Sequence, residues 1–307
     1  MERRETKGYI LIFAAGLLWG TIGIFLKEMS LCGTSALEIS FLRMAFAFVC
    51  MMIISVACGK LPKFRITGKQ LLICALLGVL CHGIHNILYC LAVAFSGVSV
   101  SAAVMNIAPA VTLITACILF SEGLSYWKIS AILLNIFGCT LAVTGGDLSF
   151  ENVSFIGVAC AIGAGATYGL TPIVGRFVMK EVDVFVSSTY SYLFAALILV
   201  GPAQPWAMDL GGELPKVLIL VTGLALIPTG IGYVIYYRGV AMIEETSKAS
   251  VIASNQTVVA CILGMIIFGE KMNLACWLGV TIILVSIALM NMKKVPSLNR
   301  KTVPEVQ

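Results

Sequence analysis

Ten long apolar stretches follow one another along the chain, separated by short polar segments. Each is close to the length of about 20 residues that a helix needs to cross the hydrocarbon core of a bilayer. Because backbone groups in lipid must bond within their own segment, we expect each stretch to be a helix. The pattern therefore predicts an all-α integral membrane protein with spans at 9–28, 35–57, 70–95, 98–120, 126–145, 155–178, 183–202, 216–243, 248–269 and 273–292.

The second half of the chain repeats the first at a nearly constant offset. The segment Gly16-Leu-Leu-Trp-Gly20 returns as Gly165-Ala-Thr-Tyr-Gly169, and Pro109 with Glu122 matches Thr257 with Glu270. Each repeat holds five spans, so the second enters the membrane from the opposite side, an arrangement typical of transporters. We expect two inverted five-helix repeats at 9–145 and 155–292, with cytoplasmic tails at 1–8 and 293–307.

The placement of lysine and arginine predicts the orientation, because these residues favour the cytoplasmic side. One side receives fifteen of them and the other only Lys27, Lys216 and Lys271. The N-terminus and the C-terminus are thus predicted to be cytoplasmic. The fifteen are Arg3, Arg4, Lys7, Lys60, Lys63, Arg65, Lys69, Lys128, Arg176, Lys180, Lys248, Lys293, Lys294, Arg300 and Lys301.

Composition supports the membrane class and excludes several others. Hydrophobic residues make up 60% of the chain and charged residues 11%, against about 45–50% and 25% in soluble domains. The net charge of +5 is explained by anchoring at an anionic inner leaflet, so we expect no nucleic-acid partner. Short tails without an organelle-targeting extension favour a bacterial inner membrane.

No cofactor or metal is expected. The eleven cysteines are scattered singly, without Cys-x-x-Cys or a cysteine–histidine cluster at metal-ligand spacing. The chain also lacks the glycine-rich loop of a nucleotide motor and a serine, histidine and aspartate set for hydrolysis.

Several short motifs resemble one known family. They are Trp19-Gly20, Leu42-Arg43, Ala108-Pro109 followed by Glu122, and Phe268-Gly269-Glu270, spread over the paired repeats. Together they resemble the EamA family of the drug/metabolite transporter superfamily. The chain departs from the family with Ser121-Glu122, where Gly-Glu is usual, and with Gln256-Thr257, where Glu-Pro is common. The resemblance implies a carrier, with amino acids and their derivatives as the leading substrate class.

Small residues and prolines inside the spans are candidates for structural or gating roles. Gly16 with Gly20, and Gly165 with Gly169, have the spacing that lets two helices approach closely, for static packing or for rocking. Mid-span prolines free a carbonyl and bend a helix, so they could be kinks or gates around a cavity. These prolines are Pro109, Pro172 and Pro228.

Polar side chains near the bilayer midplane are the candidate substrate-binding residues. His82, His85, Asn86 and Tyr89 share one face of the third span. The two histidines could bind substrate, carry a proton or simply form packing hydrogen bonds. Their counterparts in the second repeat are Thr229, Gly232, Tyr233 and Tyr236, so the pocket should be asymmetric.

Further candidates lie on other spans. Span nine carries Ser254, Asn255, Gln256 and Thr257 at the midplane, facing the counterpart of Asn106 and Pro109 on span four. Trp19 and Tyr168 are equivalent through the repeat and could be aromatic walls or core packing. The binding candidates are therefore Trp19, His82, His85, Asn86, Tyr89, Asn106, Tyr168, Tyr233, Asn255 and Gln256.

Charged groups inside or at the ends of spans need partners. Arg43 has no carboxylate one turn away, so we expect a cross-helix hydrogen bond, or snorkelling, ahead of contact with a substrate carboxylate. Glu122 and Glu270 are expected to accept bonds from the start of the next helix.

These features predict an inner-membrane carrier that moves a small organic metabolite by alternating access, with export as the expected direction. The alternatives are an uncoupled facilitator or an uptake carrier for nucleosides, amines or sugars. A channel and an intramembrane enzyme are disfavoured, because a continuous polar path and a paired acid and base are not evident. Protons as a coupling partner and the oligomeric state stay open.

Overall fold

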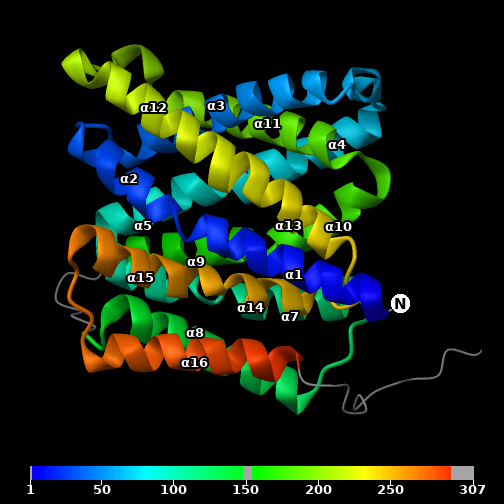
Figure 1. The fold of residues 1–307 in the computed structure, drawn as a ribbon, viewed down its shortest axis with the longest axis vertical. Coiled ribbons are helices and arrows are strands. Elements are labelled where there is room, and N and C mark those ends of the chain that lie inside the picture. Colours follow the sequence, from blue (N-terminus) through cyan, green and yellow to red (C-terminus); the bar gives the residue numbers. More distant parts are fainter. Residues whose placement is uncertain (1, 148–153, 292–307) are drawn as a thin grey trace, which may run out of the picture.

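Ten helical spans stack into one bundle (Figure 1). The computed structural model describes residues 2–147 and 154–291. Within those ranges, ten helices are long and apolar enough to cross a membrane, and no strand is present. They coincide with the predicted spans to within a few residues at most ends, which confirms the all-α prediction. Residues 2–8 of the predicted tail are helical and continue into the first span, whereas 292–307 lie outside the described residues.

Most spans are built from more than one helical segment. In the first repeat the elements are α1 (Glu2–Trp19), α2 (Ile22–Leu31), α3 (Ala36–Ala57), η1 (Leu61–Phe64), α4 (Gly68–Leu76), η2 (Leu77–Ile84), α5 (His85–Ser96), α6 (Val98–Met105), α7 (Ala108–Phe120) and α8 (Tyr126–Thr144). In the second they are α9 (Phe155–Gly169), α10 (Thr171–Glu181), α11 (Val184–Ala203), η3 (Pro205–Ala207), η4 (Gly211–Glu213), α12 (Leu214–Leu224), η5 (Ala225–Ile231), α13 (Gly232–Val240), α14 (Ser247–Ala253), α15 (Asn255–Phe268) and α16 (Leu274–Asn291).

The interruptions fall at equivalent places in the two repeats. Spans one and six break after Trp19 and at Leu170, and spans four and nine break at Asn106 and Ser254. Spans three and eight each contain a π-helical segment, η2 and η5. Pro109 and Pro172 stand in the first turn after a break, and Pro228 lies inside η5. Discontinuous helices and π-helical turns are features of transport and other functional sites.

A single glycine separates spans three and four. Gly97 has a φ of 76°, and it joins the end of α5 to the start of α6 without another loop residue. An L-residue rarely adopts this left-handed conformation, so glycine permits the abrupt reversal. The predicted end of span three at 95 and start of span four at 98 are confirmed to within one residue.

Spans five and ten pack together at one edge of the bundle, and spans two and seven lie toward the opposite edge (Figure 1). A Cβ atom added to Gly279 on α16 would lie 2.3 Å from the backbone nitrogen of Ala142 on α8, so the two helices touch backbone to backbone. Large apolar side chains cover the outside: Phe155 is 86% exposed and Ile118 73%. Such surfaces are stable facing lipid. The remaining spans surround the centre of the bundle.

Candidate functional site

The π-helical segment η5 places an irregular backbone near the centre of the bundle. Pro228 has no N–H and disrupts the normal bond to the carbonyl of Leu224. That carbonyl instead accepts a hydrogen bond from the Thr229 hydroxyl at 2.8 Å. Side chains also bond two neighbouring carbonyls. Trp19 Nε1 donates to the carbonyl of Pro228 at 3.0 Å, and the Tyr192 hydroxyl donates to the carbonyl of Thr229 at 2.9 Å. The proline-induced irregularity is thus held by spans one and seven.

Arg43 reaches this segment from α3. Its Nε donates to the Thr229 hydroxyl at 2.8 Å, which confirms the expected cross-helix hydrogen bond. Among the described residues no carboxylate forms an ion pair with Arg43. Because a guanidinium has five N–H donors and stays charged, Arg43 keeps donors and a positive charge that no described carboxylate neutralises.

Aromatic rings enclose His82 beside this arginine. His82 is 1% exposed, and its Nε2 lies 3.2 Å from the Tyr237 hydroxyl. Its ring and that of Tyr233 form a T-shaped pair with a centroid distance of 4.7 Å. Trp19 packs on Tyr233 and Tyr236 with centroid distances of 4.7 Å in both cases. His82, Trp19 and Tyr233 are therefore brought together as predicted, but within a packed aromatic cluster rather than on an open face.

His85 lies in a second, partly exposed aromatic group. Its ring stacks on Tyr168 at 5.3 Å and on Tyr89 at 6.4 Å. Its Nδ1 is 3.0 Å from the carbonyl oxygen of Ala164. Since a carbonyl only accepts, Nδ1 carries the proton in this arrangement and Nε2 is left as an acceptor when the ring is neutral. Gln256 on α15 donates to the Tyr168 hydroxyl at 3.0 Å, which joins span nine to the group.

The predicted polar run of span nine does not act as one surface. Ser254 accepts a bond from Asn135 on α8, and Asn255 donates to the carbonyl of Phe13 on α1. Gln256 bonds to the aromatic group of His85, through the Tyr168 hydroxyl. The expectation that the run faces the counterpart of Asn106 and Pro109 is therefore wrong, because the break at Ser254 rotates successive side chains toward different helices.

Asn86 and Asn106 form no hydrogen bond to a histidine ring among the described residues. The Asn86 amide donates to the carbonyl of His82 at 2.5 Å and accepts from the Ser40 hydroxyl at 3.3 Å. Asn106 stands at the break of span four, and its buried Nδ2 has no partner among the described residues. The oxygen of Asn255 at the equivalent break is also buried without a partner. Unpaired buried amides are costly, so both breaks hold unused hydrogen-bonding capacity.

The glycines bring the two repeats into contact at these breaks. A Cβ atom on Gly16 would lie 1.7 Å from the Asn255 oxygen, and one on Gly20 would lie 2.4 Å from the Cβ of Val259. In the other repeat, a Cβ on Gly165 would lie 2.8 Å from the Met105 carbonyl oxygen, and one on Gly169 would lie 2.5 Å from that of Ala108. Span one thus packs on the break of span nine, and span six on the break of span four.

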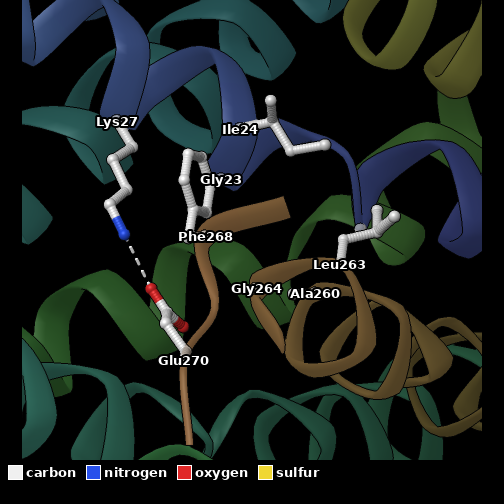
Figure 2. Close-up of a pocket in the computed structure, with 9 residues that line it drawn as sticks. Gly23, Ile24, Lys27, Ala260, Leu263, Gly264, Phe268 and Glu270 are labelled. Atoms are coloured by element: carbon white, nitrogen blue, oxygen red, sulfur yellow. Dashed lines mark hydrogen bonds and ion pairs between the residues drawn. The ribbon is translucent and has the colours of Figure 1, made fainter. Parts of the chain in front are cut away.

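The two end-of-span glutamates have partners that differ from the expectation. Glu122 accepts hydrogen bonds from the backbone nitrogens of Thr246 and Ser247 and from the Ser247 hydroxyl, at 2.5, 3.2 and 2.6 Å. These residues start span nine and not the next helix, span five. Glu270 pairs with Lys27 at 2.8 Å, beside a small pocket of about 110 Å³ (Figure 2). The expected contact with the next helix is wrong for Glu122, because the inverted repeat brings spans four and nine together.

Sequence reasoning missed Tyr192, Tyr237 and the partners of Glu122. Tyr192 and Tyr237 are fully buried and bond to η5 and His82. Their phenol groups inside apolar spans were an available signal, because a buried tyrosine hydroxyl requires a partner. No group of three or more possible metal ligands is present within residues 2–147 and 154–291.

The fold is that of a multi-pass membrane transporter, with ten spans in two inverted repeats and interrupted helices that pack on one another. Residues 6–144 and 155–292 each match the EamA-like transporter family. The chain therefore belongs to the EamA-like transporter family, as the motifs predicted.

Relatives and a solved structure agree with this class. The chain is 23% identical over 310 residues to the uncharacterized inner membrane transporter YicL of Salmonella typhimurium, with 93% of this chain and 95% of YicL covered. An uncharacterized transporter of Archaeoglobus fulgidus is 24% identical, with 94% and 100% covered. The similarity to the uncharacterized transporter YwfM of Bacillus subtilis, 24% identical, spans 54% of each chain. A crystal structure at 15% identity superposes with a TM-score of 0.77, covering 94% of this chain and 98% of that one, and shows the same fold.

Proposed function

We propose that this protein exports small metabolites that carry a carboxylate, with amino acids and their derivatives as the leading class. The observation that carries the proposal is Arg43, a cation inside a membrane span with no carboxylate partner among the described residues. Charged groups within the membrane are expensive and are associated with functional sites. A substrate carboxylate would supply the missing counter-charge through two parallel hydrogen bonds.

The surroundings of Arg43 support an amphipathic substrate. Trp19 and Tyr233 pack against each other beside η5, the segment that Arg43 bonds, and supply aromatic surface for an apolar group. His85 Nε2 forms no hydrogen bond among the described residues, so it is available to accept one from a substrate ammonium. A carboxylate, an ammonium and an apolar side chain would each meet a suitable group. Among the predicted binding residues, Trp19, His85, Tyr168, Tyr233 and Gln256 stay candidates for direct contact.

Alternating access between the repeats is the proposed mechanism. The breaks of spans one, four, six and nine and the glycine contacts across them support rocking of one repeat against the other. The prolines at or near these irregularities, Pro109, Pro172 and Pro228, would act as gating positions. The excess of lysine and arginine at the end of the bundle that carries α1's first residues supports a cytoplasmic N-terminus. The family resemblance supports export.

The test is counterflow in proteoliposomes with matched substrate pairs. A radiolabelled aromatic amino acid should exchange, and the amine that lacks only its carboxylate should not. Arg43→Gln removes the charge but keeps a donor for Thr229, so the apparent affinity should fall about 10–100-fold, as expected from losing a hydrogen bond to a charged group. Arg238→Gln is the control, because Arg238 is exposed at the end of α13 over the Phe185 ring.

The alternatives give different results in the same assay. Equal exchange of the amine would refute recognition of a carboxylate, and exchange of nucleosides or sugars alone would support the second class of carrier. A pH gradient that accelerates exchange would identify protons as a coupling partner, and the double variant His82→Gln with His85→Gln should then abolish that acceleration. Exchange indifferent to the gradient would identify a facilitator.

A further inference from the structure

Two three-residue clusters occupy equivalent places at opposite ends of the bundle. At one end, Glu122 lies 3.6 Å from Arg176, and the guanidinium of Arg176 lies 4.6 Å from the centre of the Phe120 ring. At the other end, Glu270 lies 2.8 Å from Lys27, whose ammonium is 3.9 Å from the centre of the Phe268 ring. The repeat offset of 148 or 149 residues relates every member of one cluster to its counterpart. We refer to them as the Glu122 cluster and the Glu270 cluster.

The two clusters differ in burial and in hydrogen bonding. The Glu122 side chain is 5% exposed and binds the first residues of span nine through Thr246 and Ser247. Arg176 adds bonds to the Glu244 carbonyl at 2.7 Å and to the Thr246 hydroxyl. The end of span four is therefore tied to the start of span nine.

The Glu270 cluster is open. The side chains of Glu270 and Lys27 are 57% and 45% exposed. They border the pocket between α2 and α15 (Figure 2). By the repeat relation, the docking partner of Glu270 would be the start of span four at Val98. Within the described residues Glu270 forms no hydrogen bond to α6. An exposed ion pair contributes little stability, so it can separate readily.

We propose that Glu122 and Glu270 are alternating latches, each closing its own end of the bundle by docking on the first turn of the partner span. Glu122 docks on span nine and Glu270 docks on span four, and only one is docked at a time. In this structure Glu122 is docked on Thr246 and Ser247, whereas Glu270 is exposed and pairs with Lys27. The carboxylate suits this role because the first turn of a helix presents free N–H groups and a partial positive charge.

The exclusivity follows from the packing of the repeats. Spans four and nine each contact the glycine-rich segment of a span in the other repeat, at Gly165 and Gly169 or at Gly16 and Gly20. Rocking that brings the end of span nine onto span four must separate the end of span four from span nine. The latches would thus contribute to the energy difference between the two states without contacting substrate, and the proposal does not depend on the identity of that substrate.

Hydrogen exchange followed by mass spectrometry in lipid nanodiscs tests this with Glu122→Gln. Losing charge-assisted bonds should raise exchange at 244–253 about tenfold and lower exchange at 97–105, as the opposite end closes. Glu245→Gln is the control, because Glu245 pairs with Lys128 and Lys248 at the same end. Glu245→Gln should change exchange only at 244–253 and leave exchange at 97–105 unchanged. Faster exchange at 244–253 without protection at 97–105 would show a local contact and overturn the reciprocal mechanism, and so would no change at either segment.

Glu270→Gln keeps the test decisive if the first variant does not fold. Its side chain is exposed in the present state, so folding and exchange at 244–253 should match the unmodified protein. The variant cannot stabilise the opposite state, and its rate of conformational cycling in counterflow should fall about tenfold. Glu270→Asp should recover part of that rate. A normal rate in Glu270→Gln would refute the latch role of Glu270.

Discussion

Ser121 holds a backbone conformation that favours glycine, and replacing it should stabilise the protein. Ser121 ends α7 with φ 53° and ψ 35°, a left-handed conformation that costs an L-residue about 1–2 kcal/mol. Its side chain is exposed. Ser121→Gly removes the strain, while the greater freedom of glycine in the unfolded chain costs about 0.4–1 kcal/mol. The net gain should be about 0.5–1 kcal/mol, or a rise in melting temperature of about 1–3 °C.

The equivalent position in the second repeat provides the control. Gly269 ends α15 with φ 65°, and a Cβ atom there would meet nothing within 4 Å. Gly269→Ser should therefore destabilise through the backbone alone, by a similar amount. The assay is thermal unfolding in detergent, followed by the fraction of monodisperse protein. A lower melting temperature for Ser121→Gly, or an unchanged one for Gly269→Ser, would refute the argument from backbone strain.

Two further perturbations test packing and pH dependence. Gly169→Ala places a Cβ atom 2.5 Å from the Ala108 carbonyl oxygen, so it should destabilise the protein by about 1–3 kcal/mol and slow counterflow, whereas Gly201→Ala, with open space around it, should be tolerated. Burial opposes ionisation of Asp183, but bonds from Lys63 at 2.7 Å and the Phe185 nitrogen hold its pKa below the ordinary 3.8. The ionised Asp183 therefore stabilises the folded protein fully above pH 3.8, and this contribution is lost as the pH falls through the lower pKa that Asp183 has in the folded state. In a plot of melting temperature against pH, Asp183→Asn should reduce the decline at acid pH. An equal decline in the variant and the unmodified protein would contradict this assignment.

The membrane class and the architecture could be predicted from the sequence, because the bilayer imposes strong local constraints. Each span needs an apolar stretch of defined length, and duplication leaves repeated residues at a constant offset. Gly97, Pro109 and Pro172 also marked real ends and breaks, since their backbone preferences act locally. The prediction of a hydrogen bond for Arg43 succeeded because an isolated charge in hydrocarbon requires a partner.

The centre of the bundle was less predictable. His82 and His85 share a face in the sequence pattern, yet one ring is enclosed by tyrosines and the other stacks beside Tyr168. The π-helical turn in η2 changes the rotation between them. The break at Ser254 likewise sends Ser254, Asn255 and Gln256 toward three different helices. A regular helical projection cannot describe side chains beside such interruptions.

The sequence by itself determined the ten spans, the two inverted repeats and the residues available for chemistry. Only the tertiary structure decided which of them meet. Arg43 lies against Thr229, and Glu122 against Thr246 and Ser247, through contacts between segments more than a hundred residues apart. The physical reason is that lipid exposure and backbone bonding are set locally by each segment. The partner of a polar side chain depends on how separate spans rotate and cross.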